Sequence, residues 1–105
     1  MTYTVHITEK AEQDILAAVD YIEFTLFNPQ AADNLLGAIE KAINPLSEMP
    51  LIHSLIEDPI LSSHQIRFLP VNNYIMFYAV NEKSKTVNIL RFLYEKRNWE
   101  EILNS

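Results

Sequence analysis

The stretch QIRFLPVNNYIMFYAVNEKSKTVNILRFLY, residues 65–94, decides the fold of this 105-residue chain. It contains three runs rich in aromatic and β-branched residues, which favour strands, separated by short polar stretches with the proline and asparagines typical of turns. The runs are Gln65–Leu69, Tyr74–Val80 and Thr86–Tyr94. Three consecutive strands with short connections predict an antiparallel meander.

Two amphipathic helices are predicted upstream of the meander. Apolar residues recur at spacings of three and four from Ala11 to Leu26, after Thr8, a residue typical of helix N-caps. A second stripe begins at Asn28-Pro29, a cap followed by proline in the first turn, and Pro45 ends it. Two helices joined by a few residues form an antiparallel hairpin. We expect the single glycine, Gly37, to let these helices pack closely.

The remaining segments complete the order β-α-α-β-β-β-α. Residues 2–7 alternate as a strand does, residues 49–63 have no sustained period and predict a loop, and Trp99–Leu103 follows the capping-box spacing of Asn98 and Glu101. The prediction is an α+β fold, an antiparallel sheet with a helical hairpin packed on one face and a short C-terminal helix. At this length we expect residues 1–105 to form one domain.

The net charge of −6 is unevenly distributed along the chain. Residues 1–60 carry two lysines against ten acids, a net −8, and residues 61–105 carry six cations against four acids, a net +2. We expect an acidic, solvated surface on the helices and any anion-binding surface on the last strands. Arg67 and Arg97 should be exposed there and share one cleft.

Several classes of function lack the residues that they need. The absence of cysteine excludes disulfides and thiol chemistry, and one glycine cannot build a glycine-rich phosphate loop. His6, His53 and His64 lack metal-ligand spacing, so we expect no metal and no cofactor. No apolar run reaches the roughly 18 residues of a membrane span and no signal segment is evident, which favours a cytoplasmic location.

Arg91 stands out because strand alternation places it with apolar neighbours. Alternation puts Arg91 on one face with Val87, Ile89 and Leu93, and the opposite face carries Leu90, Phe92 and Tyr94. A cation on an apolar face predicts an ion pair, here with Asp14 or Asp20 on the first helix.

Fragments along most of the chain, in their order and spacing, resemble the RelE/ParE superfamily, the small toxins of bacterial type II toxin–antitoxin systems. In the first half they are Tyr3-x-Val5, Ala11-x-x-Asp14-Ile15, Asp20-Tyr21-Ile22, Asn28-Pro29-x-Ala31-Ala32 and Leu46-x-x-x-Pro50. In the second half they are Arg67, Asn73–Tyr78, Val87-x-Ile89-Leu90-Arg91-x-Leu93 and Arg97-Asn98-Trp99.

The resemblance implies one of two activities. RelE-like members cut messenger RNA in the ribosomal decoding site, whereas ParE-like members bind DNA gyrase and stall it. Ile75 stands where the nucleases usually have an arginine, and Tyr94 stands where histidine is common. Histidine at the Tyr94 position is common in ParE-like members and in some nucleases, so these departures argue against RNA cleavage, for which His64 is then the one remaining base with an ordinary pKa near 7. The ParE-like branch is favoured by the Ile89-Leu90-Arg91 stretch and the Asn73–Tyr78 strand. A cognate antitoxin, bound through an amphipathic helix or an added strand in the groove between sheet and hairpin, is implied in either case.

Three hypotheses therefore follow, each with its own residues. The favoured one is a gyrase-binding toxin, with target- or antitoxin-binding residues Arg67, Tyr74, Tyr78, Arg97 and Trp99. The alternative is a ribosome-dependent mRNA endonuclease, with arginines stabilising the phosphate and a tyrosine transferring a proton, and its catalytic residues would be Arg67, Arg91, Tyr94 and Arg97. The third is a drifted member that kept antitoxin binding and lost toxicity, which the acidic composition motivates.

Overall fold

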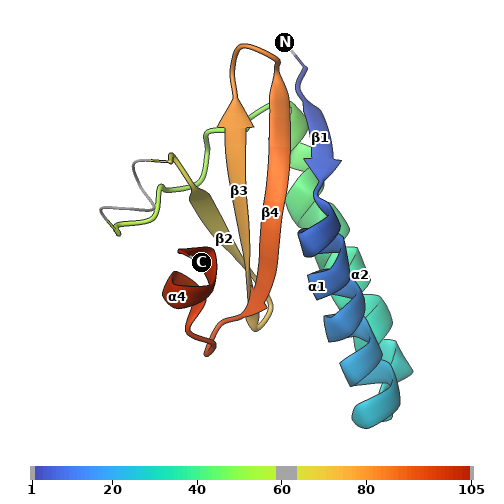
Figure 1. Cartoon of the computed structure of the whole chain (residues 1–105). Coiled ribbons are helices and arrows are strands. Elements are labelled where there is room, and N and C mark those ends of the chain that lie inside the picture. The colour runs from blue at the N-terminus through green and yellow to red at the C-terminus, as the bar shows by residue number, and fades with distance from the viewer. Residues whose placement is uncertain (1, 59–63, 105) are drawn as a thin grey trace.

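The structure, a computed structural model, describes residues 2–58 and 64–104. Its strands form one sheet in the order β1-β4-β3-β2 (Figure 1). Their bounds are Thr4–Ile7 for β1, Arg67–Val71 for β2, Tyr74–Asn81 for β3 and Thr86–Tyr94 for β4. Strands β2, β3 and β4 pair antiparallel, which confirms the predicted meander.

The first strand runs parallel to its neighbour. In the β1–β4 ladder Thr4 lies opposite Thr86 and Ile7 opposite Ile89. The prediction of a wholly antiparallel sheet is therefore wrong at this edge, and the sheet is mixed. Alternation in a sequence predicts a strand but carries no information on its direction, which depends here on where the helical hairpin returns the chain to the sheet.

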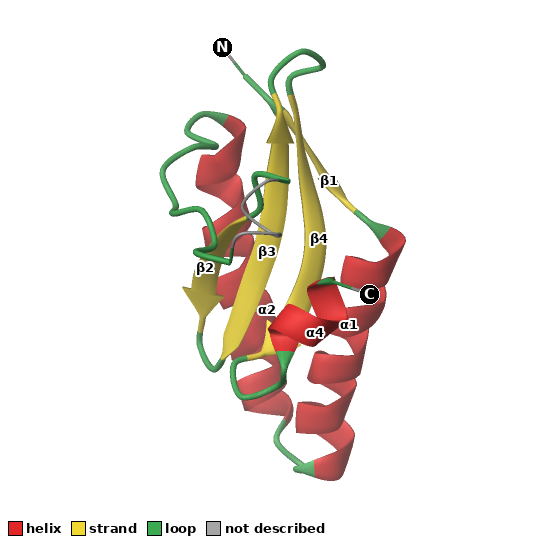
Figure 2. Cartoon of the chain, turned by 60° about the vertical axis from the view of Figure 1, so that its left-hand side comes forward, coloured by secondary structure: helices red, strands yellow, loops and turns green. Residues whose placement is uncertain are grey.

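Two long helices cover one face of the sheet, and a short one lies on the other face (Figures 1 and 2). Helix α1 spans Glu9–Asp20, α2 spans Pro29–Ile43, and α4 spans Trp99–Leu103. The caps follow the prediction. Thr8 Oγ1 accepts a hydrogen bond from the Ala11 N–H at 3.3 Å, and Asn28 Oδ1 accepts one from the Ala31 N–H at 3.1 Å.

The far end of the hairpin departs from regular α-helix. Residues Tyr21–Thr25 form a π-helical turn, in which the Leu26 N–H donates to the Tyr21 carbonyl at 3.0 Å. Phe27 follows with φ 52°, in the left-handed region. The predicted stripe to Leu26 thus ends in a widened turn, a feature that often accompanies functional surfaces. This end of the hairpin projects beyond the sheet (Figure 1).

The main core lies between the hairpin and the sheet. Its helical members are small or branched, and its sheet members include fully buried aromatic and aliphatic side chains. They are Ala11, Ala18, Leu35, Ile39, Leu46, Leu69, Val71, Met76, Tyr78, Val87, Ile89 and Phe92. A second, smaller cluster on the opposite face holds Ile56, Ile66, Phe77 and Leu93, with Trp99, Ile102 and Leu103 of α4 packed against it.

A bulge in β4 reverses the predicted alternation. Phe77 pairs with Arg91 while the next residue of β3, Tyr78, pairs with Ile89, so Leu90 has no residue opposite. An extra residue in one strand moves every later side chain to the other face. Ile89 and Phe92 therefore both belong to the main core, whereas Leu93 belongs to the second cluster and Arg91 pairs with Phe77 of that cluster. The predicted faces, with Arg91 and Leu93 beside Val87 and Ile89 and with Phe92 beside Leu90, are wrong.

Strand β2 lies two residues later than predicted, since it begins at Arg67 instead of Gln65 and runs through Pro70 to Val71 instead of ending at Leu69. Proline lacks an N–H but is tolerated on an edge strand, where that side of the ladder needs no donor. The outer edge of β2 is covered near its start by the predicted loop: Leu55 bridges Arg67, and the Ile56 N–H donates to the Ile66 carbonyl at 2.9 Å. The rest of that loop, residues 59–63, lies outside the described residues.

Gly37 does not serve close packing of the helices, contrary to the prediction. A Cβ built at this position would meet nothing within 4 Å. In α4 the predicted helix is confirmed, but the Asn98 amide donates to the Glu101 carboxylate at 2.9 Å and caps no backbone N–H. Among the described helices none is long and apolar enough for a membrane span.

Candidate functional site

A cleft opens between the hairpin end and the adjoining end of the sheet. We call it the tyrosine cleft, because three phenols line it, and its volume is about 630 Å³. The lining side chains are Tyr21, Ile22, Leu26, Asn28, Ala31, Asn73, Tyr74, Tyr94 and Arg97. Three residues proposed from the sequence, Tyr74, Tyr94 and Arg97, thus come together in the groove between sheet and hairpin.

The meander positions two of the phenols at matching strand ends. Tyr74 opens β3 and Tyr94 closes β4, and the two are register partners whose rings meet edge to face at 5.8 Å between centroids. Tyr74 also stacks on Phe92 of the core at 4.9 Å. Backbone hydrogen bonds from Glu95 to the Asn73 carbonyl and from Arg97 to the Tyr94 carbonyl, at 2.9 and 3.0 Å, hold the adjoining turns. The aromatic floor of the cleft is therefore fixed by the sheet.

The third phenol comes from the helical hairpin. Tyr21 is the first residue of the π-helical turn and is 52% exposed. Burial first, and then the neighbouring phenols of Tyr94 and Tyr21, raise the pKa of Tyr74 above its usual value. The Tyr74 phenol therefore stays protonated at physiological pH, which makes it a poor general base. Tyr21 is a site residue that was not predicted, and its only signal in the sequence is its place in the Asp20-Tyr21-Ile22 fragment.

Arg91 lies outside the cleft and is engaged by α1. Its Nε donates to Asp14 Oδ2 at 2.7 Å and its Nη2 to Asp14 Oδ1 at 3.0 Å, which confirms the predicted ion pair. The hydrogen bond with Asp14 is also the main cause that raises the pKa of Arg91. The carboxylate of Asp14 offsets the charge of this guanidinium, which weakens its attraction for a phosphate.

Arg67 and Tyr78 lie four residues of β3 away from the cleft. Arg67 pairs with Tyr78 in the β2–β3 ladder, whereas Tyr74 pairs with Tyr94. At the usual rise of a strand this separation is about 13 Å. Arg67 Nη1 donates to the His53 carbonyl at 2.7 Å. The Arg67 side chain lines a different hollow, together with Leu51, Leu55, Gln65, Val80 and Glu82. The prediction that Arg67 and Arg97 share one cleft is therefore wrong.

Tyr78 is not presented on the surface. Its side chain is fully buried, and its hydroxyl donates to the Pro50 carbonyl at 2.8 Å. Burial also raises the pKa of Tyr78, an effect that Arg67 partly offsets. In this conformation Tyr78 anchors the loop after α2 to the sheet, so its role in the structure is packing.

The histidines do not join the tyrosine cleft. Burial lowers the pKa of His53, whose ring meets the Tyr78 ring edge to face at 6.2 Å between centroids. His64 is exposed in the turn before β2, and His6 is exposed on β1. In residues 2–58 and 64–104, no group of three or more His, Asp or Glu side chains could hold a metal ion.

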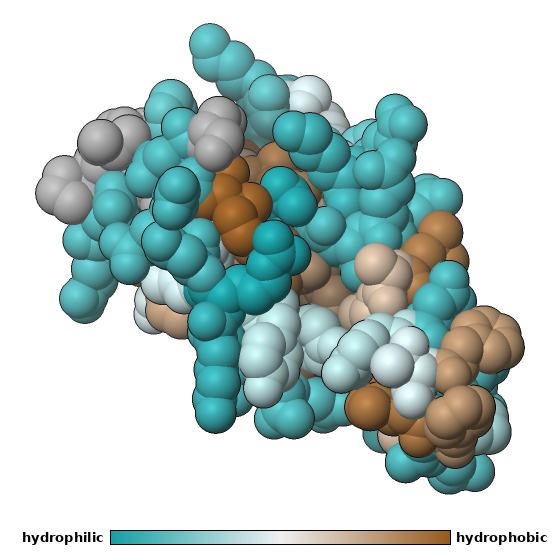
Figure 3. All heavy atoms as spheres, turned by 60° about the horizontal axis from the view of Figure 1, so that its bottom comes forward, coloured by the Kyte–Doolittle hydropathy of each residue, from teal (hydrophilic) through white to brown (hydrophobic). Residues whose placement is uncertain are grey.

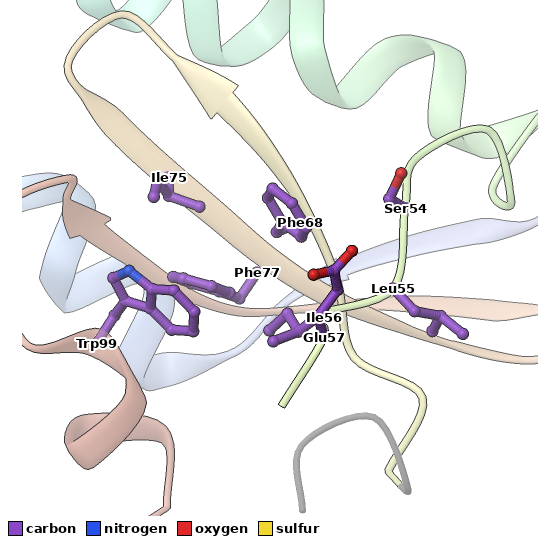
Figure 4. A pocket seen from close by; sticks show the side chains of 8 residues that line it. All are labelled: Ser54, Leu55, Ile56, Glu57, Phe68, Ile75, Phe77 and Trp99. Carbon is purple, nitrogen blue, oxygen red and sulfur yellow. The ribbon is translucent and has the colours of Figure 1, made fainter. Parts of the chain in front are cut away.

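Trp99 lines a second hollow, which lies on the face of the sheet against which α4 packs (Figure 4). This apolar slot has a volume of about 320 Å³ and is lined by Ser54, Leu55, Ile56, Glu57, Phe68, Ile75, Phe77 and Trp99. The Trp99 and Phe77 rings lie 5.5 Å apart. Trp99 is thus separated from the tyrosine cleft by the sheet and belongs to the second cluster.

The fold, a mixed four-stranded sheet under a helical hairpin, is that of the RelE/ParE superfamily of toxins. The family model of the ParE toxin of the type II toxin–antitoxin system parDE matches residues 5–99. The chain therefore belongs to this ParE toxin family. No curated protein sequence matches it.

Solved structures share the fold. One is from the chromosomal ParDE toxin–antitoxin system of P. aeruginosa, with a TM-score of 0.70 and 22% identity, covering 89% of this chain and 96% of that one. Another, from the RelBE2 complex of Mycobacterium tuberculosis, has a TM-score of 0.62 and 21% identity over 90% of this chain and 99% of that one. A further structure, from the RelE–RelB complex of Pyrococcus horikoshii OT3, has a TM-score of 0.56 and 18% identity, and the match covers 92% of this chain and 99% of that one.

Proposed function

We propose that this toxin arrests growth by binding DNA gyrase through the tyrosine cleft, acts in the cytoplasm, and is neutralised by a cognate antitoxin. The observation that carries the proposal is an open cleft of tyrosine and arginine side chains that lacks two of the four candidate catalytic residues. Tyr74, Tyr94 and Arg97 gather in this cleft. Of the residues considered for RNA cleavage, Tyr94 and Arg97 lie here, but Arg67 and Arg91 lie outside and are hydrogen-bonded elsewhere.

Cleavage of RNA by attack of the 2′-hydroxyl needs a base, cations for the phosphorane and an acid, all at one phosphate. Arg91 is paired with Asp14, and Arg67 is tied to the His53 carbonyl about 13 Å along the sheet from the cleft. The raised pKa of Tyr74 lowers the fraction of its phenol that is ionised at neutral pH, so little phenolate is present to act as a base. These features favour binding over cleavage.

The cleft has the composition of a protein-binding surface. Tyrosine and arginine dominate interface hot spots, because each combines a large apolar contact area with a polar end. Tyr94 is 40% exposed and Tyr21 52%, and Arg97 is also exposed, so a partner can reach these groups without unfolding the toxin. The solved relatives come from toxin–antitoxin systems, which supports an antitoxin partner for this chain as well.

Two reactions on one purified sample test the proposal. The first adds the toxin to gyrase and relaxed plasmid and follows supercoiling; the second adds it to programmed ribosomes and maps cleavage of the message. We expect loss of supercoiling and an intact message. Message cleavage that disappears in the Arg67→Ala variant would overturn the proposal in favour of the RelE-like alternative.

A further inference from the structure

An exposed apolar surface continues from the tyrosine cleft onto the end of the hairpin. Phe24 is 66% exposed, Leu26 54% and Phe27 85%, and we call these three side chains the hairpin-end patch. Leu26 also lines the cleft, so the two surfaces are continuous. Viewed from below, brown and tan side chains gather at this end of the molecule beside pale ones (Figure 3).

The patch is unfavourable for the isolated fold. Phe27 takes φ 52°, a conformation in which glycine or asparagine is unstrained and an aromatic residue is not. Its ring is also left in water, so the fold gains no burial in return for the strained backbone. Strained positions and contiguous exposed apolar side chains are both features of surfaces that bind a partner.

Charge identifies the kind of partner. Residues 11–40 hold six acidic residues and no lysine, arginine or histidine. One of the six, Asp14, forms the ion pair with Arg91. Asp20, exposed at the end of α1, lies four residues before Phe24 in sequence. Two such acidic hairpin ends repel each other, which disfavours a second copy of this chain as the occupant. A partner with cationic side chains around an apolar groove is complementary.

We propose that the hairpin-end patch inserts its aromatic side chains into an apolar groove bordered by lysine or arginine side chains on the toxin's target protein. This inference rests on the proposed function, since it takes gyrase as that target. Phe24 and Phe27 act as the apolar anchors, and Asp20 contributes to the rate of association and to its salt dependence.

The test measures the Kd of the full-length toxin for purified gyrase at low and at physiological salt. The variants are Phe24→Ser, Phe27→Asn and Asp20→Lys, and the matched control is Met49→Ser, because Met49 is 54% exposed and follows the opposite end of α2. We expect Phe24→Ser and Phe27→Asn each to weaken binding about tenfold or more, and the control to change it less than about twofold. Phe27→Asn should not lower the Tm, which separates binding from folding. Asp20→Lys should weaken binding mainly at low salt.

The outcomes separate the two proposals. Wild-type binding that Phe24→Ser and Phe27→Asn leave unchanged would overturn the hairpin-end patch and leave gyrase as the target. Absence of wild-type binding would overturn the proposed function and this inference with it. A concentration-dependent dimer, seen in sedimentation of the wild type and abolished by Phe24→Ser, would make a second copy the occupant and overturn the charge argument.

Discussion

Arg91 and Asp14, 77 residues apart in sequence, form a bidentate ion pair that joins the last strand to the first helix, with Nε–Oδ2 and Nη2–Oδ1 distances of 2.7 and 3.0 Å. Asp14 Oδ2 also accepts the Phe92 N–H at 3.0 Å. The neighbouring strand β1 ends at Ile7, opposite Ile89. The carboxylate therefore satisfies a backbone donor of β4 beyond the point where its partner strand stops.

This arrangement predicts a large stability effect at Asp14. The variant Asp14→Asn should lower the free energy of unfolding by about 2 kcal/mol, because it leaves the Arg91 guanidinium without its charged partner and weakens the acceptor for Phe92. Denaturant unfolding followed by circular dichroism measures the change. The control Asp20→Asn, at an exposed carboxylate on the same helix, should change stability by less than about 0.5 kcal/mol. Equal effects of the two substitutions would show that the ion pair contributes nothing specific.

Gly37 offers a stabilising substitution. Because a Cβ at this helical position meets nothing within 4 Å, Gly37→Ala should gain the helix propensity of alanine without a clash. We expect the free energy of unfolding to rise by about 0.5–1 kcal/mol, with gyrase binding unchanged. Thermal and denaturant unfolding of the variant measure this gain. A loss of stability would mean that the α2 surface is more crowded than the structure shows.

Stability should fall at high pH because of the buried phenols. The pKa of Tyr74 is raised above its usual value near 10 by burial and by the phenols of Tyr94 and Tyr21, and burial raises that of Tyr78 as well. Above about pH 10 the unfolded chain releases phenol protons that the folded chain retains. The contribution of these phenols to the free energy of unfolding is therefore constant below this pH and is lost as the pH rises. Unfolding free energies at about pH 9 and about pH 11 should differ less in Tyr74→Phe than in wild type. Identical pH profiles would contradict the burial of this phenol.

Two exposed side chains that the sheet end contributes to the cleft, Tyr94 and Arg97, should matter for function but not for folding. Tyr94→Ala and Arg97→Ala should each weaken gyrase inhibition about tenfold, because each removes a hot-spot type of side chain from the proposed interface. Their Tm values should stay close to that of wild type, since both residues are exposed. Growth arrest on induced expression, compared at matched protein levels, gives an independent readout. Full toxicity of the double variant would place the target surface elsewhere.

Local pattern was sufficient to predict most of the fold. Spacing and side-chain chemistry within a few neighbouring residues predict the helix caps at Thr8 and Asn28. The same kind of local signal predicts the apolar stripes of the helices and the three strands of the meander. The Arg91–Asp14 pair was predicted as well, because a cation among apolar strand residues requires a carboxylate and the first helix supplies one. The face assigned to Arg91 was nevertheless wrong, since the bulge pairs it with Phe77 of the second cluster.

Features that depend on long-range geometry were not predictable. The parallel direction of β1 depends on how the whole hairpin returns to the sheet, and the bulge at Leu90 depends on the registers of two strands at once. Arg67 was expected beside Arg97, but the loop carbonyl of His53 that holds it has no signature in the sequence. Tyr21 entered the cleft because a π-helical turn rotates the end of α1, which helical periodicity alone does not reveal.

The most direct test of the central claim is a titration of gyrase supercoiling with the purified wild-type toxin, run in parallel with Arg97→Ala. We predict that the wild type inhibits supercoiling and that Arg97→Ala requires about ten times more protein for the same inhibition. Full supercoiling activity in a large excess of the wild-type toxin would contradict the account.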